Sequence, residues 1–245
     1  MASDSSVDMA GQSRNKLPAT SVVVDHVSKT IRGHMVLKDV SMSLVGGRSY
    51  GLRGPNGSGK TMLMRAICGL LRPSKGQVLI DGRRLGRDIS FPPHVGALIE
   101  NPAFLSERTA LQNLRLLAAI RKQATETDIR AALASIGLDP EDRRPYRKFS
   151  LGMRQRLGIA AALMEDPRLI VVDEPGNGLD RDGVEQLREL LADRRGAGAL
   201  VVLASHNRED LEILCDEVFD IDAGELVGHR FLDEQAASKP RRALP

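Results

Sequence analysis

The chain has 245 residues and a formal net charge of +3, and 42% of its residues are hydrophobic but only 3% aromatic. This length suits one α/β domain with an insertion, or two small domains, with a core built from aliphatic side chains. No apolar run reaches the length of about 18 residues that a membrane-spanning helix needs, which excludes such a helix. The small net charge, without a basic stripe and interleaved aromatic residues, argues against nucleic acid as the main partner.

The two ends of the chain differ in composition from the middle. Residues 1–20 are mostly polar and lack the apolar core of a signal peptide, so we expect a disordered leader. The short basic segment 236–245 is expected to be a mobile tail, which leaves residues 21–235 for the folded domain. Cys68 and Cys215 have no metal-ligating residues at short spacing, and we expect both to be reduced core residues.

The first part of the chain predicts an antiparallel layer beside a strand–loop–helix unit. Residues 48–53 can extend into a buried strand, and the segment 61–70 carries apolar residues at helical spacing. A short apolar strand is also predicted at 95–99. β-branched or alternating residues predict three strands of the antiparallel layer: 21–27, 40–45 and 77–80.

The loop of this strand–loop–helix unit, Gly54-Pro55-Asn56-Gly57-Ser58-Gly59-Lys60-Thr61, fits the P-loop pattern G-x-x-x-x-G-K-[ST]. Its glycines let backbone N–H groups curl around phosphate oxygens, and the start of the following helix adds a favourable dipole. We expect the loop and Met62 to bind a nucleoside triphosphate, with Lys60 reaching the β- and γ-phosphates and Thr61 ligating Mg²⁺. The alternative, a glycine-rich turn that happens to contain a lysine, leaves the flanking strand and helix unexplained.

Residues 103–164 predict a helical subdomain inserted between the strands. Thr109 can cap one helix and Thr127 a second, each followed by apolar residues at helical spacing. Ser150 precedes a third helix at 154–164. The three segments together form a helical block that interrupts the succession of strands.

Alternating strands and helices return after this block. Short apolar runs predict the strands, and amphipathic segments predict the helices. The predicted strands are 169–173, 200–204 and 218–221, and the predicted helices are 182–191 and 208–215. Such alternation is typical of a mainly parallel sheet with helices on both faces, so we predict an α/β fold of the P-loop NTPase type with an antiparallel β layer and an inserted helical subdomain.

The apolar strand at 169–173 ends in two acids, Asp173 and Glu174. In open α/β folds ligands bind at the carboxyl ends of the strands, which is the edge where the P-loop also lies. Asp173 is then positioned to hold Mg²⁺, because a hard cation prefers carboxylate oxygens. Glu174 is positioned to act as general base on an attacking water. The alternative is an acidic loop after a core strand, which the P-loop makes the weaker interpretation.

Three further segments carry a family resemblance. Phe149-Ser150-Leu151-Gly152-Met153-Arg154-Gln155-Arg156 resembles the signature motif of ATP-binding cassette (ABC) ATPases, in the Ser-Leu-Gly-Met form of drug-exporter branches. Gly178-Leu179-Asp180 resembles the D-loop of that family, and Ser205-His206 resembles its switch histidine. The order and spacing of all the motifs are similar to those of ABC ATPases over residues 21–228, nearly the whole chain.

The resemblance implies a head-to-tail dimer, of this chain or of this chain and a close relative, with ATP and Mg²⁺ enclosed between the subunits. Ser150 and Gly152 would contact the γ-phosphate bound at the P-loop of the opposite subunit, and Asp180 would organise the interface. His206 would contact the γ-phosphate and couple hydrolysis to closure. Ser150 and Asp180 can equally be ordinary helix N-caps, and a lone histidine at a strand end is more often structural.

Two positions depart from the family pattern. Glu100 stands where the family usually has glutamine, and it resembles the branch that exports lantibiotics and bacitracin-like peptides. Its carboxylate can still serve Mg²⁺ or the water, but it adds negative charge. The aromatic residue that stacks on adenine in the family should lie near residues 30–34, where His34 carries the only ring. Preference for ATP over GTP is therefore expected to be weak.

The complete motif set and the lack of a membrane span predict an ATPase that powers a separate membrane-spanning exporter of peptides, antibiotics or other amphiphiles. We expect it at the cytoplasmic face of the membrane, with the surface of the helical subdomain beside residues 100–104 docked on a transmembrane permease. One alternative is a soluble ABC ATPase acting on nucleic acid or ribosomes, although this chain has one cassette and no heptad run. Another is a degenerate cassette that only binds nucleotide, although Lys60, Asp173, Glu174 and His206 are all present.

Overall fold

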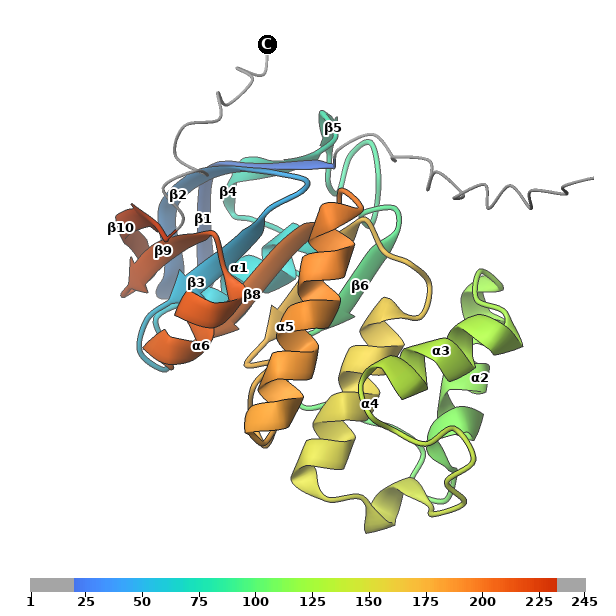
Figure 1. Cartoon of the computed structure of the whole chain (residues 1–245). Helices are drawn as coiled ribbons and strands as arrows, with labels where there is room; N and C mark the ends of the chain where they lie inside the picture. Colours follow the sequence, from blue (N-terminus) through green and yellow to red (C-terminus); the bar gives the residue numbers. More distant parts are fainter. Residues whose placement is uncertain (1–19, 233–245) are drawn as a thin grey trace, which may run out of the picture.

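The computed structural model describes residues 20–232, which fold around two β-sheets (Figure 1). The predicted tail at 236–245 lies outside the described residues, as does the predicted leader except for Thr20. Thr20 is buried, and its carbonyl accepts the N–H of Gly46 at 2.7 Å.

The first sheet is the predicted antiparallel layer, with the strand order β2-β1-β4-β5. Its strands are β1 (Ser21–Ile31), β2 (His34–Val45), β4 (Lys75–Ile80) and β5 (Arg83–Arg84). β1 and β2 continue beyond the predicted segments as a long hairpin. A register shift between Val24 and Val27, where His26 has a φ of +48°, breaks the alternation from which the strand ends were predicted.

The second sheet has the P-loop strand near its middle, in the order β10-β9-β3-β8-β7-β6. Its strands are β3 (Ser49–Arg53), β6 (Val95–Leu98), β7 (Leu169–Asp173), β8 (Leu200–Ser205), β9 (Glu217–Asp222) and β10 (Glu225–Phe231). The neighbours pair in parallel except β10, which is antiparallel to β9, so the prediction of a mainly parallel sheet is confirmed. The sequence did not predict β10, because this edge strand is half exposed and contains Gly228.

Alternate residues of the central strands belong to two separate cores. Leu169 and Val171 of β7 share a core with α1 (Lys60–Ile67) and the antiparallel sheet, so α1 packs between the two sheets. Ile170 and Val172 belong to the core on the opposite face, which includes residues of several helices, among them α4 (Leu151–Leu163), α5 (Arg181–Gly196) and α6 (Arg208–Leu214). Helices therefore cover both faces of the parallel sheet, as predicted.

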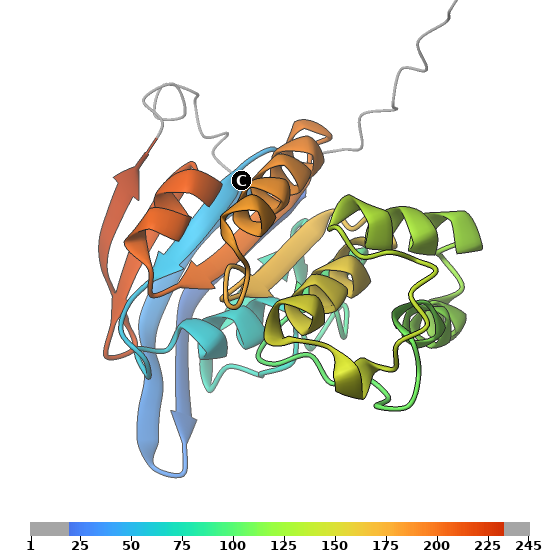
Figure 2. The same cartoon turned by 60° about the horizontal axis from the view of Figure 1, so that its bottom comes forward.

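The predicted helical subdomain lies at one side of the molecule, away from the antiparallel sheet (Figures 1 and 2). It contains α2 (Ala110–Arg121), α3 (Glu126–Ser135), a single 3-10 turn at Tyr146–Lys148 and α4. Tyr146 contacts the rings of Phe104 and Phe149, with centroids 5.4 and 5.8 Å away, and these three rings form the aromatic part of the subdomain core. α4 also packs on β6 and β7, and so connects the subdomain to the sheet.

Three helices that have side-chain caps begin at other residues than predicted, and the capping residue explains each start. Thr125, not Thr127, caps α3, because its hydroxyl accepts the N–H of Asp128 and the Asp128 carboxylate accepts the N–H of Thr125. α4 begins directly after Ser150, three residues earlier than predicted. α5 begins directly after Asp180. Side-chain caps, rather than the first apolar residue, determine where these helices start.

Candidate nucleotide-binding site

The P-loop connects β3 to α1, and its first glycine is required by close backbone packing. A Cβ atom at Gly54 would lie 2.1 Å from the carbonyl oxygen of Ile221 and 2.6 Å from the Ser58 hydroxyl. The loop is also hydrogen-bonded to the β9–β10 turn, where the Gly224 N–H donates to the Ser58 carbonyl at 2.9 Å. The loop is therefore held on the end of the sheet before any ligand binds.

Lys60 is the first residue of α1 and lies folded over the loop. Its ammonium donates hydrogen bonds to the carbonyl oxygens of Gly54, at 2.7 Å, and Pro55, at 3.0 Å. The side chain is buried, so its charge is placed at the centre of the glycine-rich loop. Backbone N–H groups, a buried cation and the N-terminus of α1 together form a site suited to the phosphates of a nucleotide.

Thr61 and Asp173, the two residues predicted to hold Mg²⁺, are in direct contact. The Thr61 hydroxyl donates to the Asp173 carboxylate at 2.7 Å, across from α1 to the end of β7. Burial raises the pKa of Asp173 above its usual value, and the hydrogen bond from Thr61 opposes that shift. A hydroxyl and a carboxylate beside a phosphate-binding loop are a donor set that fits Mg²⁺, which usually binds one or two protein oxygens together with substrate phosphates.

Glu174 and His206 also lie together, at the ends of the neighbouring strands β7 and β8. One oxygen of the Glu174 carboxylate accepts the backbone N–H of His206 at 3.1 Å and lies 2.9 Å from its Nδ1 atom. The other oxygen accepts the Ser205 hydroxyl at 3.2 Å. Glu174 adopts a φ of +48°, in the left-handed region, which turns its side chain away from the line of the strand. The carboxylate is thus oriented by two residues of one neighbouring strand.

Glu100, predicted as a further metal ligand, has a different partner. Its carboxylate accepts a hydrogen bond from the Arg65 guanidinium at 2.7 Å, although its charge still contributes to raising the pKa of Asp173. Sequence reasoning missed Arg65. Its position, four residues after Thr61, was the available signal, because residues i and i+4 share one face of a helix.

The signature segment and the D-loop segment pack against each other. A Cβ atom at Gly152 would lie 2.5 Å from the carbonyl oxygen of Gly178. The Ser150 hydroxyl caps α4 by accepting the Met153 N–H at 3.2 Å. Asp180 caps α5 and also forms a 3.0 Å ion pair with Arg156 of α4. Both capping interpretations therefore hold, and the predicted roles of Ser150, Gly152 and Asp180 at a second subunit stay predictions.

Gln155 connects the signature helix to the loop that carries the predicted general base. Its buried side-chain amide donates to the carbonyl oxygens of Glu174, at 3.0 Å, and Pro175, at 3.2 Å. Gln155 was not predicted as a site residue. A polar side chain on the buried face of a helix was the signal that could have identified it, because such groups are nearly always hydrogen-bonded.

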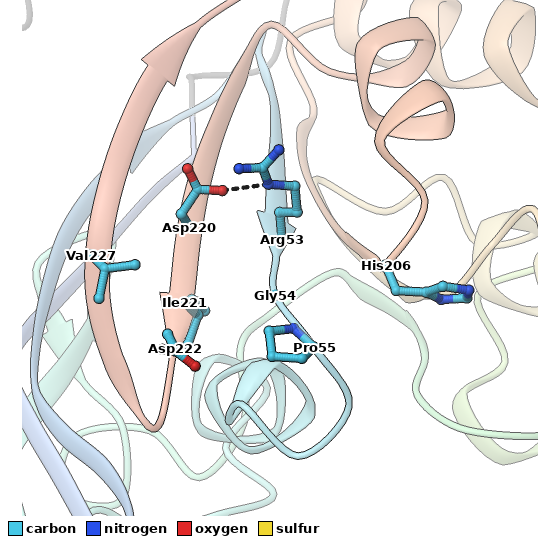
Figure 3. A pocket seen from close by; sticks show the side chains of 8 residues that line it. All are labelled: Arg53, Gly54, Pro55, His206, Asp220, Ile221, Asp222 and Val227. Carbon is cyan, nitrogen blue, oxygen red and sulfur yellow. Dashed lines mark hydrogen bonds and ion pairs between the residues drawn. The ribbon is translucent and has the colours of Figure 1, made fainter.

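A cavity of about 430 Å³ opens beside the P-loop, and Figure 3 shows the residues around it. Gly54 and Pro55 form one wall and His206 lies across from β9 and β10. Arg53, at the end of the P-loop strand, forms a 2.6 Å ion pair with Asp220 of the neighbouring strand β9. β10, which was not predicted from the sequence, therefore contributes to the surroundings of the site through Val227.

Comparison with known proteins identifies the family to which this chain belongs. Residues 37–177 match the family model described as ABC transporter. The chain is 40% identical over 205 residues to the ABC transporter ATP-binding protein YybJ of Bacillus subtilis, a match that covers 84% of this chain and 94% of that protein. The chain therefore belongs to the ABC transporter family, as one of its ATP-binding proteins, and ATP hydrolysis is the characteristic activity of such ATPase domains.

Two other relatives have names that include a transported compound. The lantibiotic transport ATP-binding protein SrtF of Streptococcus pyogenes is 33% identical, over 83% of this chain and 88% of that protein. The bacitracin transport ATP-binding protein BcrA of Enterococcus faecalis is 34% identical, over 84% of this chain and 68% of that protein. A solved ATP-binding subunit of an ABC transporter superposes with a TM-score of 0.77 at 28% identity, covering 87% of this chain and 90% of the other. The fold and the family resemblance are confirmed.

Proposed function

We propose that this ABC ATPase binds and hydrolyses ATP to power an exporter whose membrane-spanning part is a separate protein, and that the cargo is a peptide, an antibiotic or another amphiphile. Within residues 20–232, no helix has the length and apolarity to cross a bilayer. SrtF and BcrA, whose names record lantibiotic and bacitracin transport, support the class of cargo. The observation that carries the ATPase part is the single cluster formed by Lys60, Thr61, Asp173, Glu174 and His206.

In this proposal each residue of the cluster has a distinct role. Lys60 and the loop N–H groups bind the β- and γ-phosphates, and Thr61 and Asp173 hold Mg²⁺, which supplies charge neutralisation on the phosphates when bound. Glu174 accepts a proton from the attacking water, because its carboxylate is held in place by the Ser205 hydroxyl and the His206 backbone N–H. His206 contacts the γ-phosphate and couples hydrolysis to closure, and its Nδ1 atom lies 2.9 Å from the Glu174 carboxylate.

The second subunit completes the site in this proposal. Ser150 lies exposed at the N-terminus of α4, where its hydroxyl and the helix dipole are available to a γ-phosphate held by another copy or by a close relative. Gly152 and Asp180 hold the signature and D-loop segments against each other in the same subunit. Both segments can therefore move as one body when two subunits close.

The membrane partner is proposed to dock on the helical subdomain beside residues 100–104, at the cytoplasmic face of the membrane. α2 presents Leu116, Leu117 and Ile120 to solvent, the last of these 78% exposed. An apolar groove of about 330 Å³ lies beside the end of α2, lined in part by Phe91 and Arg121. Exposed apolar side chains gathered on one helix favour an interaction surface.

The proposal is tested by purifying a tagged Glu174→Gln variant from native membranes in the presence of ATP and Mg²⁺. The variant keeps nucleotide binding, while turnover is expected to fall about 10²-fold or more with the loss of the base. A protein with several membrane spans should co-purify. The matched control, Glu174→Gln combined with Lys60→Ala, cannot hold the phosphates and should lose the ATP-dependent part of that capture.

Two outcomes would overturn the proposal. Recovery of ribosomal or DNA-bound proteins in place of a membrane protein would favour a soluble ABC ATPase. Unchanged ATP turnover in the Glu174→Gln variant would remove Glu174 from the role of general base.

A further inference from the structure

Three carboxylates gather at the carboxyl ends of two neighbouring strands, close to where the phosphates would bind. β6 and β7 are parallel, with Leu98 paired to Val172, so the chain reaches Glu100 just beyond β6 and Asp173 and Glu174 at the end of β7. The charges interact, since both Glu174 and Glu100 contribute to raising the pKa of Asp173. A triphosphate brings further negative charge to the same place. Like charges at short distance repel unless a cation compensates them.

Arg65 supplies such a cation from α1. Arg65 and Thr61 are four residues apart and therefore lie on one face of the helix. Thr61 donates to Asp173 at 2.7 Å, and one turn further along Arg65 donates to Glu100 at 2.7 Å. Within residues 20–232, the Arg65 guanidinium is the only side chain that pairs with the Glu100 carboxylate. One face of α1 therefore donates hydrogen bonds to carboxylates of both acidic loops.

The loop that carries Glu100 is also attached to the helical subdomain. The Pro102 carbonyl accepts the Tyr146 hydroxyl at 2.8 Å. A Cβ atom at Gly158 of α4 would lie 2.9 Å from Leu98 and 3.1 Å from Pro102, so α4 packs tightly on the same loop. Glu100 itself has a φ of +65°, a conformation that non-glycine residues adopt at a cost. The ion pair to Arg65 therefore joins α1 to a loop that also contacts the helical subdomain.

We propose that Arg65 is a positioning residue for nucleotide binding: it neutralises Glu100 and holds this third carboxylate away from the triphosphate. This inference rests on the proposed function, since it concerns the same site. Arg65 acts through Glu100 and needs no contact with the nucleotide.

The proposal predicts the outcome of a double-variant cycle. In Arg65→Gln, Glu100 is uncompensated, and the affinity for a non-hydrolysable ATP analogue should fall about tenfold, the size expected for one added charge roughly 10 Å away at an effective dielectric constant near 20. Arg65→Gln combined with Glu100→Gln should regain nearly the affinity of the unmodified chain. Arg65→Lys, which keeps the charge, should bind the analogue with nearly the same affinity as the unmodified chain, because the contact with Glu100 involves one nitrogen.

The measurement is binding of the analogue by calorimetry at low and high salt, with and without Mg²⁺, together with the thermal midpoint of each ligand-free variant. The loss in Arg65→Gln should shrink at high salt, because salt screens partly exposed charges. Arg188→Gln is the matched control. It removes the same charge from a pair with Glu185 within α5 and should leave the affinity unchanged.

Failure of this inference can be distinguished from failure of the proposed function. If the double variant binds as weakly as Arg65→Gln, Arg65 acts on the nucleotide or on folding, and the inference is overturned. Equal affinities in all the variants would also overturn it, while the proposed function would stand. If the unmodified chain does not bind the analogue at all, the proposed function itself fails.

Discussion

At the scale of single residues, the buried negative charge of Asp173 lowers the free energy of unfolding of the ligand-free protein. Burial raises the pKa of this carboxyl group, so the folded state binds its proton more tightly than the unfolded chain does. This loss of stability is present at pH values above the pKa of Asp173 in the folded state, and it decreases as the pH falls through that pKa. Functional sites often carry such a cost because the charge is needed for the ligand.

Asp173→Asn is therefore expected to raise the thermal midpoint of the ligand-free protein at pH 7 while abolishing Mg²⁺-dependent nucleotide binding. The gain in midpoint relative to the unmodified chain should narrow as the pH is lowered, because protonation removes the same charge from Asp173 itself. Calorimetric scans of both proteins between pH 4 and pH 7, about the range in which carboxyl groups titrate, check this. A lower midpoint for the variant at pH 7 would show that the charged form is stabilising.

Another residue-scale feature is the lack of an aromatic ring where the base is expected. The chain has five Phe, two Tyr and no Trp, and the structure describes all of these rings. Tyr50 and Phe219 are buried in the core, and Phe231 packs on His229. Three rings form the aromatic cluster of the helical subdomain, and Phe91 lies beside the groove at α2. The tip of the β1–β2 hairpin offers Ile31 and His34.

We expect ATP and GTP to be hydrolysed with KM values within a few-fold of each other. Ile31→Tyr should lower the KM for ATP by about fivefold or more with little change in kcat, since stacking of a base on an aromatic ring contributes about 1 kcal/mol or more. Ile31→Leu is the aliphatic control. Steady-state kinetics with both nucleotides measures these KM values. A KM of the unmodified chain about tenfold lower for ATP than for GTP would contradict the expectation.

At the scale of elements, the close packing of the signature helix on the D-loop segment allows a steric test. Gly152→Ala would place a methyl group 2.5 Å from the carbonyl oxygen of Gly178, so one of the two segments must shift. We expect a loss of about 1–3 kcal/mol in the free energy of unfolding, typical of overpacking. Gly196→Ala at the end of α5 meets no atom within 4 Å and serves as control, with a gain of about 0.4–1 kcal/mol expected.

Urea denaturation of both variants measures these differences. Equal stability of Gly152→Ala and the unmodified chain would show that the loop at Gly178 moves freely. In that case the two segments would not act as one body when subunits close.

At the scale of the whole molecule, the proposed dimer depends on an exposed helix start. Ser150→Asp keeps the cap of α4, because Asp caps a helix as well as Ser does, but it places a negative charge where a γ-phosphate is expected. In the Glu174→Gln background with ATP, this change should abolish a dimer that the Ser150 parent forms. Light scattering measures the mass. A dimer that persists in Ser150→Asp would show that the signature segment does not contact the phosphate of another subunit.

The local pattern of the sequence was sufficient to predict the fold class. The P-loop, the apolar run ending in Asp173 and Glu174, and the βα alternation each arise from contacts within a few residues along the chain, where periodicity and glycine geometry dominate. The same locality explains the errors. The cap at Thr125 competes with Thr127 two residues away, and β10 exists because β9 offers it an edge.

Tertiary structure decided which distant side chains meet. Asp173 follows Thr61 by 112 residues and their contact at 2.7 Å requires the β7–α1 packing, while Gln155 reaches Glu174 only because α4 lies beneath that loop. The pairing of Glu100 with Arg65 is of the same kind. Local pattern determines what each segment can form, because backbone propensity and periodicity act at short range. The partners of a buried or charged group depend on how the segments pack, since desolvation and Coulomb energies act through space.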